Sequence, residues 1–326
     1  MKKAVFLLAM LILTFSVFAE KDTIMTEEFI KTSQIETFRF LQYVPNSQQR
    51  KLPLIVYLHG GEGRGDDLSL VRKYLFPTQI EEGYYGNLAA YVVCPQAPSG
   101  GDWTSISQSV FELIDYMCKN YNINEQKISL MGHSMGGTGT WMIAAENPKR
   151  FSCIVPMSGS IRTNDANVNK LKNMPIWAFV GMNDDKVAPE SSINFVSEIK
   201  KADPMADCEI TTFEEAGHFD VLALALEDEE IGIVNWILSK EQKNEILRYN
   251  EGRVFLKNQR EGEYTLVFAD YQSGILQNIK AEPVTCNYGK MTVSSPIVLQ
   301  KGDKIFLWDT LENMNPLAAS YNVMVN

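Results

Sequence analysis

Short apolar runs alternate with stretches of helical periodicity along the first three quarters of the chain. Apolar runs of strand length occupy residues 38–44, 54–58, 88–94, 127–131, 153–157, 176–181 and 209–213. Between them, apolar residues recur at helical spacing, and a long helix is expected over residues 221–238. Buried strands separated by helices are typical of a parallel sheet that is covered on both faces. The pattern therefore predicts an α/β fold with a mostly parallel sheet, in which residues 38–44 and 54–58 form an antiparallel pair.

The pattern changes after the charged stretch 240–248. Short β-type runs follow, separated by glycine, asparagine, proline or charge, at residues 253–257, 263–269, 274–281, 290–293 and 303–308. Such spacing without a helical segment predicts a small all-β sandwich. We therefore expect an α/β catalytic domain over residues 20–243 and a β-sandwich accessory domain over residues 244–326.

The first 19 residues have the organisation of a secretory signal peptide. Lys2 and Lys3 precede a mostly apolar run over residues 4–18, and Ala19 follows as a small residue at the cleavage position. The alternative is a membrane anchor, but the run is short for a span of about 20 apolar residues. We expect export, cleavage after Ala19, a secreted or periplasmic location and no membrane attachment after cleavage.

Charge and composition narrow the possible partners. The chain has 40 Asp and Glu against 30 Lys and Arg, for a net charge of −10, which argues against a nucleic-acid partner held through phosphates. Its five cysteines are widely spaced without a Cys-x-x-Cys pair, and most are expected to be small core residues. Its three histidines lack the spacing of metal ligands, so neither a metal nor an organic cofactor is expected. The sequence does not define an oligomeric state.

One motif stands between a predicted strand and a predicted helix. The pentapeptide GHSMG occupies residues 132–136, directly after the apolar run 128–131. A strand that turns abruptly into a helix strains its apex residue, and the flanking glycines prevent clashes. The serine hydroxyl is then exposed at the carboxyl edge of the sheet, near a helix N-terminus. Ser134 is therefore the candidate nucleophile.

A serine nucleophile needs a general base, and only three histidines are available. His133 flanks the nucleophile, where its side chain should point away from the hydroxyl, and His59 ends an early strand. His218 lies in the loop between the last predicted strand and helix of the α/β region, which opens at the same sheet edge as Ser134. His218 is therefore the candidate base.

The acid that orients the base is expected between the serine and the histidine in chain order. Asp184 and Asp185 both lie in the loop after the predicted strand 176–181. Either carboxylate could hold the imidazole tautomer and stabilise the imidazolium. Asp184 is the favoured candidate, and Asp185 remains the alternative.

Acyl transfer also needs hydrogen-bond donors for the developing oxyanion. The main-chain amide of Met135, directly after the nucleophile, is one candidate. The second is expected from the loop 59–63, where glycines let the backbone approach a substrate. Gly61 is the favoured donor and Glu62 the alternative. Aromatic residues that could line the pocket, or belong simply to the core, are Trp103, Trp141 and Tyr85.

Four segments together resemble the α/β-hydrolase superfamily. They are LIVYLHGGEGRGDD at 54–67, CPQAP at 94–98, MGHSMGGTGTW at 131–141 and PIWAFVGMND at 175–184. Within it, the chain is most similar to secreted esterases and predicted peptidases related to the phospholipase/carboxylesterase and polyester-depolymerase groups. The resemblance covers residues 38–236 and implies a set of site residues: Ser134 as nucleophile, Asp184 as acid, His218 as base, and Gly61 and Met135 as oxyanion donors.

Two departures from the family pattern lie beside the candidate acids. Val180 replaces the histidine that is frequent before Gly181, and Ala188 delays the usual Val-Pro pair by one residue. The choice between Asp184 and Asp185 therefore stays open at this stage.

The tail KIFLWDTLENMNPLA, residues 304–318, resembles the end of a β-sandwich module of secreted bacterial proteins, often found beside carbohydrate-active domains. This resemblance favours a polysaccharide-associated setting. The alternative is a module that only packs on the catalytic domain or acts as a spacer.

Three functions are compatible with these features. The first is a secreted serine carboxylesterase acting on a small ester or an esterified polysaccharide, with acetyl and feruloyl groups suggested by the resemblance. The second is a serine peptidase of the prolyl-oligopeptidase-like kind, which needs a cleft that grips an extended peptide. The third is a glycan-binding protein with a vestigial hydrolase domain, against which the complete order of Ser134, Asp184 and His218 argues.

Overall fold

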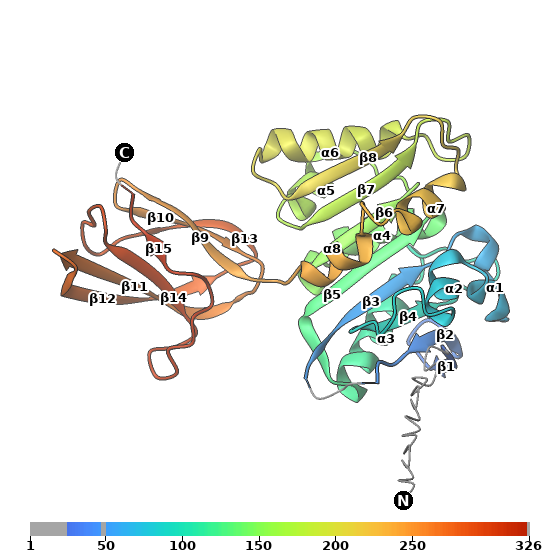
Figure 1. Cartoon of the computed structure of the whole chain (residues 1–326), viewed down its shortest axis with the longest axis horizontal. Helices are drawn as coiled ribbons and strands as arrows, with labels where there is room; N and C mark the ends of the chain where they lie inside the picture. Colours follow the sequence, from blue (N-terminus) through green and yellow to red (C-terminus); the bar gives the residue numbers. More distant parts are fainter. Residues whose placement is uncertain (1–24, 47–49, 325–326) are drawn as a thin grey trace, which may run out of the picture.

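The computed structural model describes residues 25–46 and 50–324. Within these residues the chain forms an eight-stranded sheet in the order β1-β2-β4-β3-β5-β6-β7-β8, a three-stranded sheet β13-β10-β9 and a four-stranded sheet β12-β11-β14-β15 (Figure 1). The expected signal peptide at residues 1–19 lies outside the described residues. No helix in the described part combines the length and the apolar character needed to span a membrane.

The large sheet and its helices account for residues up to Ser239. Its strands are β1 Thr26–Ile30, β2 Phe38–Tyr43, β3 Leu52–Leu58, β4 Tyr91–Pro95, β5 Ile123–His133, β6 Cys153–Met157, β7 Ile176–Gly181 and β8 Cys208–Phe213. The helices are η1 Gly61–Gly63, α1 Ser69–Arg72, α2 Leu75–Glu81, α3 Ser107–Asn120, α4 Met135–Glu146, η2 Pro148–Arg150, α5 Asp165–Leu171, α6 Glu190–Ala202, α7 Asp220–Glu227 and α8 Ile233–Ser239.

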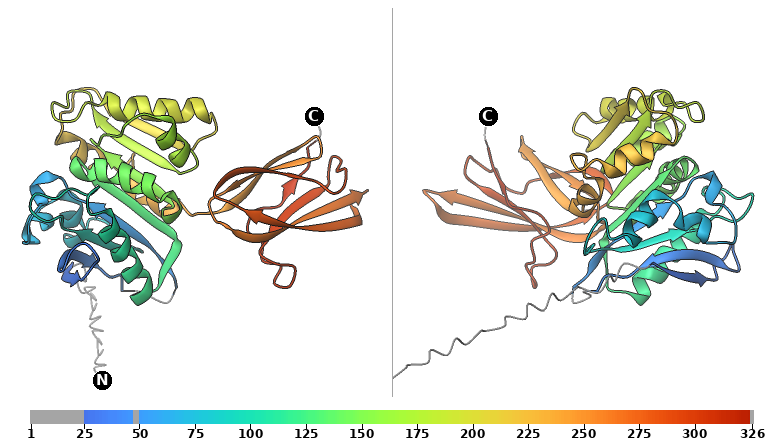
Figure 2. Two further views of the ribbon diagram at one scale, coloured as in Figure 1. Left: turned by 180° about the vertical axis from the view of Figure 1, so that it is seen from behind. Right: turned by 45° about the vertical axis from the view of Figure 1, so that its right-hand side comes forward.

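Strand β3 shows why the strands are apolar throughout. Leu54, Val56 and Leu58 point into a core shared with α3, α4 and α6, while Ile55 and Tyr57 point into a second core shared with α2, α7 and α8. Figure 1 shows α7 and α8 on the near face of the sheet, and the left view of Figure 2 shows α3 and α4 on the other face. From β4 through β3 to β8 the strands are parallel. The predicted α/β fold class is therefore confirmed.

Two expectations about individual elements are wrong. Strand β2 does not pair with β3, because β4 lies between them, antiparallel to β2 and parallel to β3. The expected helix over residues 221–238 is two helices, α7 and α8. An acidic segment over residues 227–230 and Gly232, which has a left-handed φ of 59°, interrupt the helical hydrogen bonding between them.

The C-terminal β module comprises the two antiparallel sheets. Its strands are β9 Asn244–Asn250, β10 Arg253–Asn258, β11 Gly262–Gln272, β12 Ile275–Cys286, β13 Gly289–Ser294, β14 Lys304–Trp308 and β15 Tyr321–Asn322. Alternate residues of both sheets meet in one core, as Val254 and Leu256 of β10 do with Phe268 of β11 and Ile305 of β14. The module is therefore a β-sandwich, as the short β-type runs predicted.

The β module contacts the large sheet at the edge where β6 and β8 of that sheet begin. The side-chain amide of Gln242, just before β9, donates to the main-chain carbonyl of Phe151, 2.9 Å away and just before β6. Lys290 of β13 forms an ion pair with Asp203, in the connection that leads into β8. Parallel strands present their active edge at their carboxyl ends. The module thus contacts the opposite edge, as the separation of the orange and red strands from α7 in Figure 1 also shows.

All five cysteines lie in the described residues as free thiols. Cys94, Cys153, Cys208 and Cys286 are buried, whereas Cys118 is partly exposed. Burial raises the pKa of the Cys153 thiol to about 12. Four of the five cysteines are thus small core residues, as expected for most of them.

Candidate active site

The turn at Ser134 joins β5 directly to α4. Ser134 has φ 60° and ψ −119°, a conformation that is costly for a residue with a side chain. Two glycines make the turn sterically feasible: a Cβ on Gly132 would lie 2.6 Å from the carbonyl oxygen of Gly136, and one on Gly136 would lie 1.9 Å from that of Leu58. The serine therefore stands at the carboxyl edge of the sheet, at the N-terminus of α4, as the GHSMG pattern predicts.

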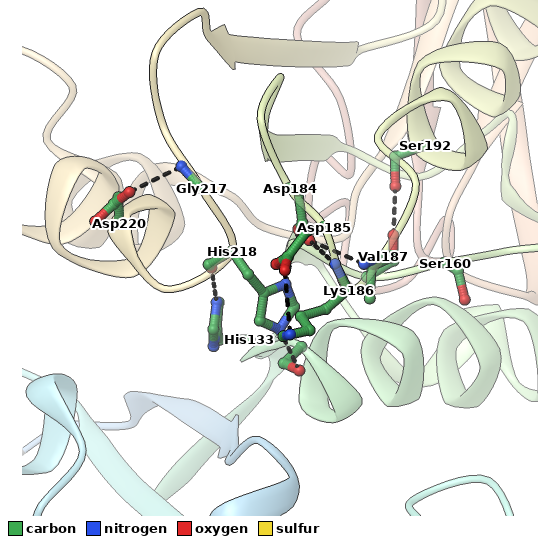
Figure 3. Close-up of polar contacts among 12 residues, drawn as sticks. His133, Ser160, Asp184, Asp185, Lys186, Val187, Ser192, Gly217, His218 and Asp220 are labelled. Atoms are coloured by element: carbon green, nitrogen blue, oxygen red, sulfur yellow. Dashed lines mark hydrogen bonds and ion pairs between the residues drawn. The ribbon is translucent and has the colours of Figure 1, made fainter.

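Ser134, His218 and Asp184 form one hydrogen-bonded chain. The Nε2 atom of His218 lies 2.7 Å from the Oγ atom of Ser134, and Nδ1 lies 2.7 Å from Oδ2 of Asp184. Figure 3 shows the His218 ring beside Asp184, with a dashed line joining the two side chains. The side chains of His218 and Asp184 are 3% and 1% exposed, so the interaction is shielded from water. This geometry orders a serine, an imidazole and a carboxylate for nucleophilic catalysis.

The two candidate acids occupy opposite environments. Asp184 accepts hydrogen bonds at Oδ1 from the amides of Lys186 and Val187, each at 2.9 Å. Burial acts to raise the pKa of Asp184, but the hydrogen bonds from Val187, His218 and Lys186 outweigh it and lower the pKa overall. The Asp185 side chain is 74% exposed and lies 3.2 Å from the ammonium of Lys186. The structure brings Asp184, and not Asp185, to the imidazole of His218.

The loop after β3 brings its backbone against Ser134. A Cβ placed on Gly60 would lie 3.4 Å from the Cβ of Ser134, and Gly61 begins the 3-10 turn η1. His59 donates from Nδ1 to the carbonyl of Gly60 at 2.6 Å and accepts from the amide of Ala97 at Nε2, 3.0 Å away. Burial lowers the pKa of His59 to about 4, so the ring is neutral near pH 7.

The hydrogen bond from His59 to the carbonyl of Gly60 fixes the direction of the next main-chain amide, that of Gly61. In a trans peptide the N–H points opposite to the C=O. Because the carbonyl of Gly60 points to the imidazole, the N–H of Gly61 points away from it. Met135, whose amide is the other candidate donor, is the first residue of α4, where amides have no helical acceptor. Sequence reasoning assigned no such function to His59, because its acceptor and donor are main-chain groups.

A cavity of about 680 Å³ opens onto the serine and histidine. Its lining residues are Gly60, Gly61, Glu62, Leu70, Lys73, Tyr74, Leu75, His133, Ser134, Lys186, His218, Phe219 and Leu222. Leu70, Tyr74, Leu75, Phe219 and Leu222 make most of the wall apolar. Among the described residues, no cluster of three or more His, Cys, Asp and Glu side chains could hold a metal ion.

The aromatic residues suggested by the sequence lie elsewhere. Trp103 and Trp141 are fully buried in the core, where their indole nitrogens donate to the carbonyl of His59 and to Ser192. Tyr85 packs against Phe76. The core interpretation holds for the two tryptophans, and the pocket wall instead takes Tyr74 and Phe219, which no motif marks.

The sheet order and the strained serine turn together define an α/β hydrolase. Residues 36–218 match the family model Esterase, described as "Putative esterase". The match covers more than half of the chain, and the chain therefore belongs to this esterase family.

One curated protein and several solved structures are similar to this chain. The bifunctional acetylxylan esterase/xylanase XynS20E of Neocallimastix patriciarum is 28% identical over 149 residues, which cover 44% of this chain and 21% of that protein. A thermostable esterase aligns with a TM-score of 0.59 and 24% identity, over 68% of this chain and 64% of its own. The chain thus spans about a fifth of the curated relative and less than two thirds of the thermostable esterase.

A third similarity, like that to the thermostable esterase, concerns the fold alone. The feruloyl esterase module of Clostridium thermocellum aligns with a TM-score of 0.50 and 14% identity, over 60% of this chain and 81% of its own.

Proposed function

We propose that the enzyme is an exported carboxylesterase that removes acetyl or feruloyl groups from polysaccharide through an acyl-enzyme on Ser134. The observation that carries the mechanism is the pair of 2.7 Å hydrogen bonds joining Asp184, His218 and Ser134. In this proposal Ser134 is the nucleophile, His218 the general base and Asp184 the orienting acid.

The first half of the reaction forms the acyl-enzyme. The Oγ atom of Ser134 attacks the ester carbonyl carbon while its proton passes to Nε2 of His218. The Asp184 carboxylate stabilises the resulting imidazolium through Nδ1. As the tetrahedral intermediate collapses, the carbon–oxygen bond to the alcohol breaks, and Nε2 returns the proton to the leaving alkoxide.

The second half releases the acid. A water molecule gives a proton to Nε2 of His218 and attacks the acyl carbon, and the bond to Ser134 breaks as Oγ regains a proton. In both halves the main-chain amides of Gly61 and Met135 donate to the oxyanion. The amide of Met135 stands at the N-terminus of α4, directly after the nucleophile, and the bond from His59 to the carbonyl of Gly60 fixes the direction of the Gly61 amide. Both donors are thus oriented before the reaction, which lowers the reorganisation needed in the transition state.

The substrate class rests on the relatives and on the second module. The curated relative is described as an acetylxylan esterase, and a structural neighbour as a feruloyl esterase module. The largely apolar cavity beside Ser134 is compatible with a small acyl group or an aromatic one. We further propose that the chain divides near residue 244 and that its β-sandwich unit holds the enzyme near polysaccharide.

A fluorophosphonate probe tests the nucleophile, and parallel assays test the substrate. The purified mature protein is labelled and then assayed on aryl esters, acetylated xylan, a feruloylated oligosaccharide and chromogenic peptides. Ser134→Ala should abolish labelling and turnover. Ser160→Ala is the matched control, because this serine lies on a neighbouring loop, near Thr138, and should keep both (Figure 3).

Three outcomes would contradict the proposal in different ways. Turnover that survives Ser134→Ala would reject the acyl-enzyme, and turnover of peptides alone would favour the peptidase. Absence of labelling, with binding to insoluble glycan retained, would favour the glycan-binding alternative. Export is tested separately, by the mass of the N-terminus recovered outside the cytoplasm, which should begin at Glu20.

A further inference from the structure

His133, the residue before the nucleophile, makes a contact that the sequence does not reveal. It is the last residue of β5, and its side chain is buried. Its Nε2 atom lies 2.8 Å from the main-chain carbonyl oxygen of His218, and Figure 3 shows this bond on the main-chain side of His218. Because a carbonyl oxygen can only accept, Nε2 of His133 carries the proton, and its tautomer is fixed.

The surroundings of His133 favour a neutral ring. Its centroid lies 5.0 Å from that of His218 and 6.4 Å from that of Phe219. Burial lowers the pKa of His133 to about 4. A neutral ring can donate to the carbonyl without placing a second positive charge beside the imidazolium that His218 becomes during the reaction.

The loop that carries His218 is hydrogen-bonded both to the loop that carries Asp184 and to the strand that leads to Ser134. The amide of Asn183, in the loop of the candidate acid, donates to the carbonyl of Ala216 at 3.0 Å. His133 supplies the corresponding bond from the strand that ends at the nucleophile. The backbone of His218 is therefore held relative to Ser134 by the residue adjacent to Ser134 itself.

We infer that His133 is a positioning residue, which holds the main chain of His218 so that its imidazole keeps both Ser134 and Asp184 within hydrogen-bond distance. The inference rests on the proposed function of His218 as the base. It extends that function by giving the histidine of the GHSMG motif, which also lines the cavity, a part in catalysis that acts through the main chain of His218. A displacement of about 1 Å can cost about 100-fold in rate, so one such bond can be kinetically large.

Two substitutions separate the hydrogen bond from the shape of the ring. His133→Phe keeps a planar ring but removes the donor, and it should lower kcat 10- to 100-fold with KM changed less than about twofold. His133→Gln restores an N–H at a similar reach, and its kcat should return to within about fivefold of the wild type. Equal losses in the two variants, or a kcat for His133→Phe within about twofold of the wild type, would overturn the inference.

A general loss of stability is separated from positioning by a matched variant. Ile199→Ala removes buried apolar atoms of α6, and its thermal midpoint should fall without a comparable loss of kcat. If Ile199→Ala loses as much kcat as His133→Phe at a similar drop in midpoint, the contact is merely structural and the inference fails. Ser134→Ala is measured in parallel, because turnover that survives it refutes the proposed mechanism rather than the role of His133.

Discussion

At the scale of single residues, two adjacent aspartates differ because the backbone turns one inward. Asp184 receives two main-chain amides and the ring of His218, whereas Asp185 faces solvent beside Lys186. The sequence limits the acid to these two residues but contains no signal for the direction of each side chain. That direction depends on the path of the loop after β7, which is a tertiary property.

The first prediction tests this assignment. Asp184→Asn should lower kcat by roughly 10²- to 10⁴-fold, because an amide cannot stabilise the imidazolium and favours the wrong tautomer of His218. Asp185→Asn is the matched control and should stay within about twofold of the wild type, since exposed charges contribute little. Steady-state kinetics on an aryl ester measure both. A larger loss in Asp185→Asn than in Asp184→Asn would make our assignment wrong.

The second prediction concerns pH and the two buried histidines. His59 and His133 have pKa values lowered from 6.5 to about 4 by burial, so the unfolded chain binds protons that the folded protein does not. The contribution of these two neutral histidines to the free energy of unfolding is fully present above pH 6.5 and is lost as the pH falls toward 4. The loss should be about 1.4 kcal/mol per pH unit for each histidine within that window.

Urea unfolding at about pH 7.5 and about pH 5 measures this loss in the wild type and in His133→Gln. The variant lacks one of the two titrating rings, so its free energy of unfolding should fall less between the two pH values. An equal fall in both proteins would show that His133 does not contribute.

At the scale of elements, apolar runs predicted that strands exist better than they predicted which strands lie side by side. The run at 54–58 is apolar throughout because β3 is buried on both faces, and that local property is legible in the sequence. The order of the strands cannot be derived from the sequence, because the 32 residues between β3 and β4 can return to either side of β3. The strand order and the break at Gly232 therefore had to come from the structure.

The serine turn is the element that the sequence predicted best. Its glycines are required by contacts within a few residues and with one neighbouring strand, so the motif itself contains the information.

The third prediction concerns Gly136→Ala, which would place a Cβ 1.9 Å from the carbonyl oxygen of Leu58 and force α4 away from β3. The free energy of unfolding should fall by about 3 kcal/mol or more. Asn169→Ala, on the exposed face of α5, is the control and should unfold like the wild type. Unchanged urea midpoints in Gly136→Ala would contradict this account.

At the scale of the whole molecule, the β module and the candidate active site lie at opposite edges of one sheet. Gln242 bonds to the main chain just before β6, whereas Ser134 donates its amide to Met157, the last residue of β6, at 2.9 Å. The sequence predicted a compositional change after residue 240 but not which edge of the sheet the later strands contact. That contact is polar and specific, and it carries no periodic pattern.

The fourth prediction uses this separation. Gln242→Ala removes the donor to two main-chain carbonyls, those of Lys149 and Phe151, and should cost about 1–3 kcal/mol in stability. Because the change lies at the far edge from Ser134, kcat and KM for a small ester should stay within about twofold of the wild type. Gln300→Ala, an exposed glutamine of the β module, should change neither quantity. A selective loss of kcat in Gln242→Ala would reveal coupling between the two edges.

The position of the β module limits which substrates the module could bring to Ser134. A five-residue strand such as β6 spans about 17 Å, so a polysaccharide held by the module, as we propose, would start at least that far from Ser134. A small ester captured there would gain no effective concentration at Ser134, because it could not reach the serine while bound. A long, flexible polymer could be held at one edge while another part of it, or a neighbouring chain, enters the cavity. Under the proposed function, the arrangement therefore favours only substrates longer than the strands that separate the two edges.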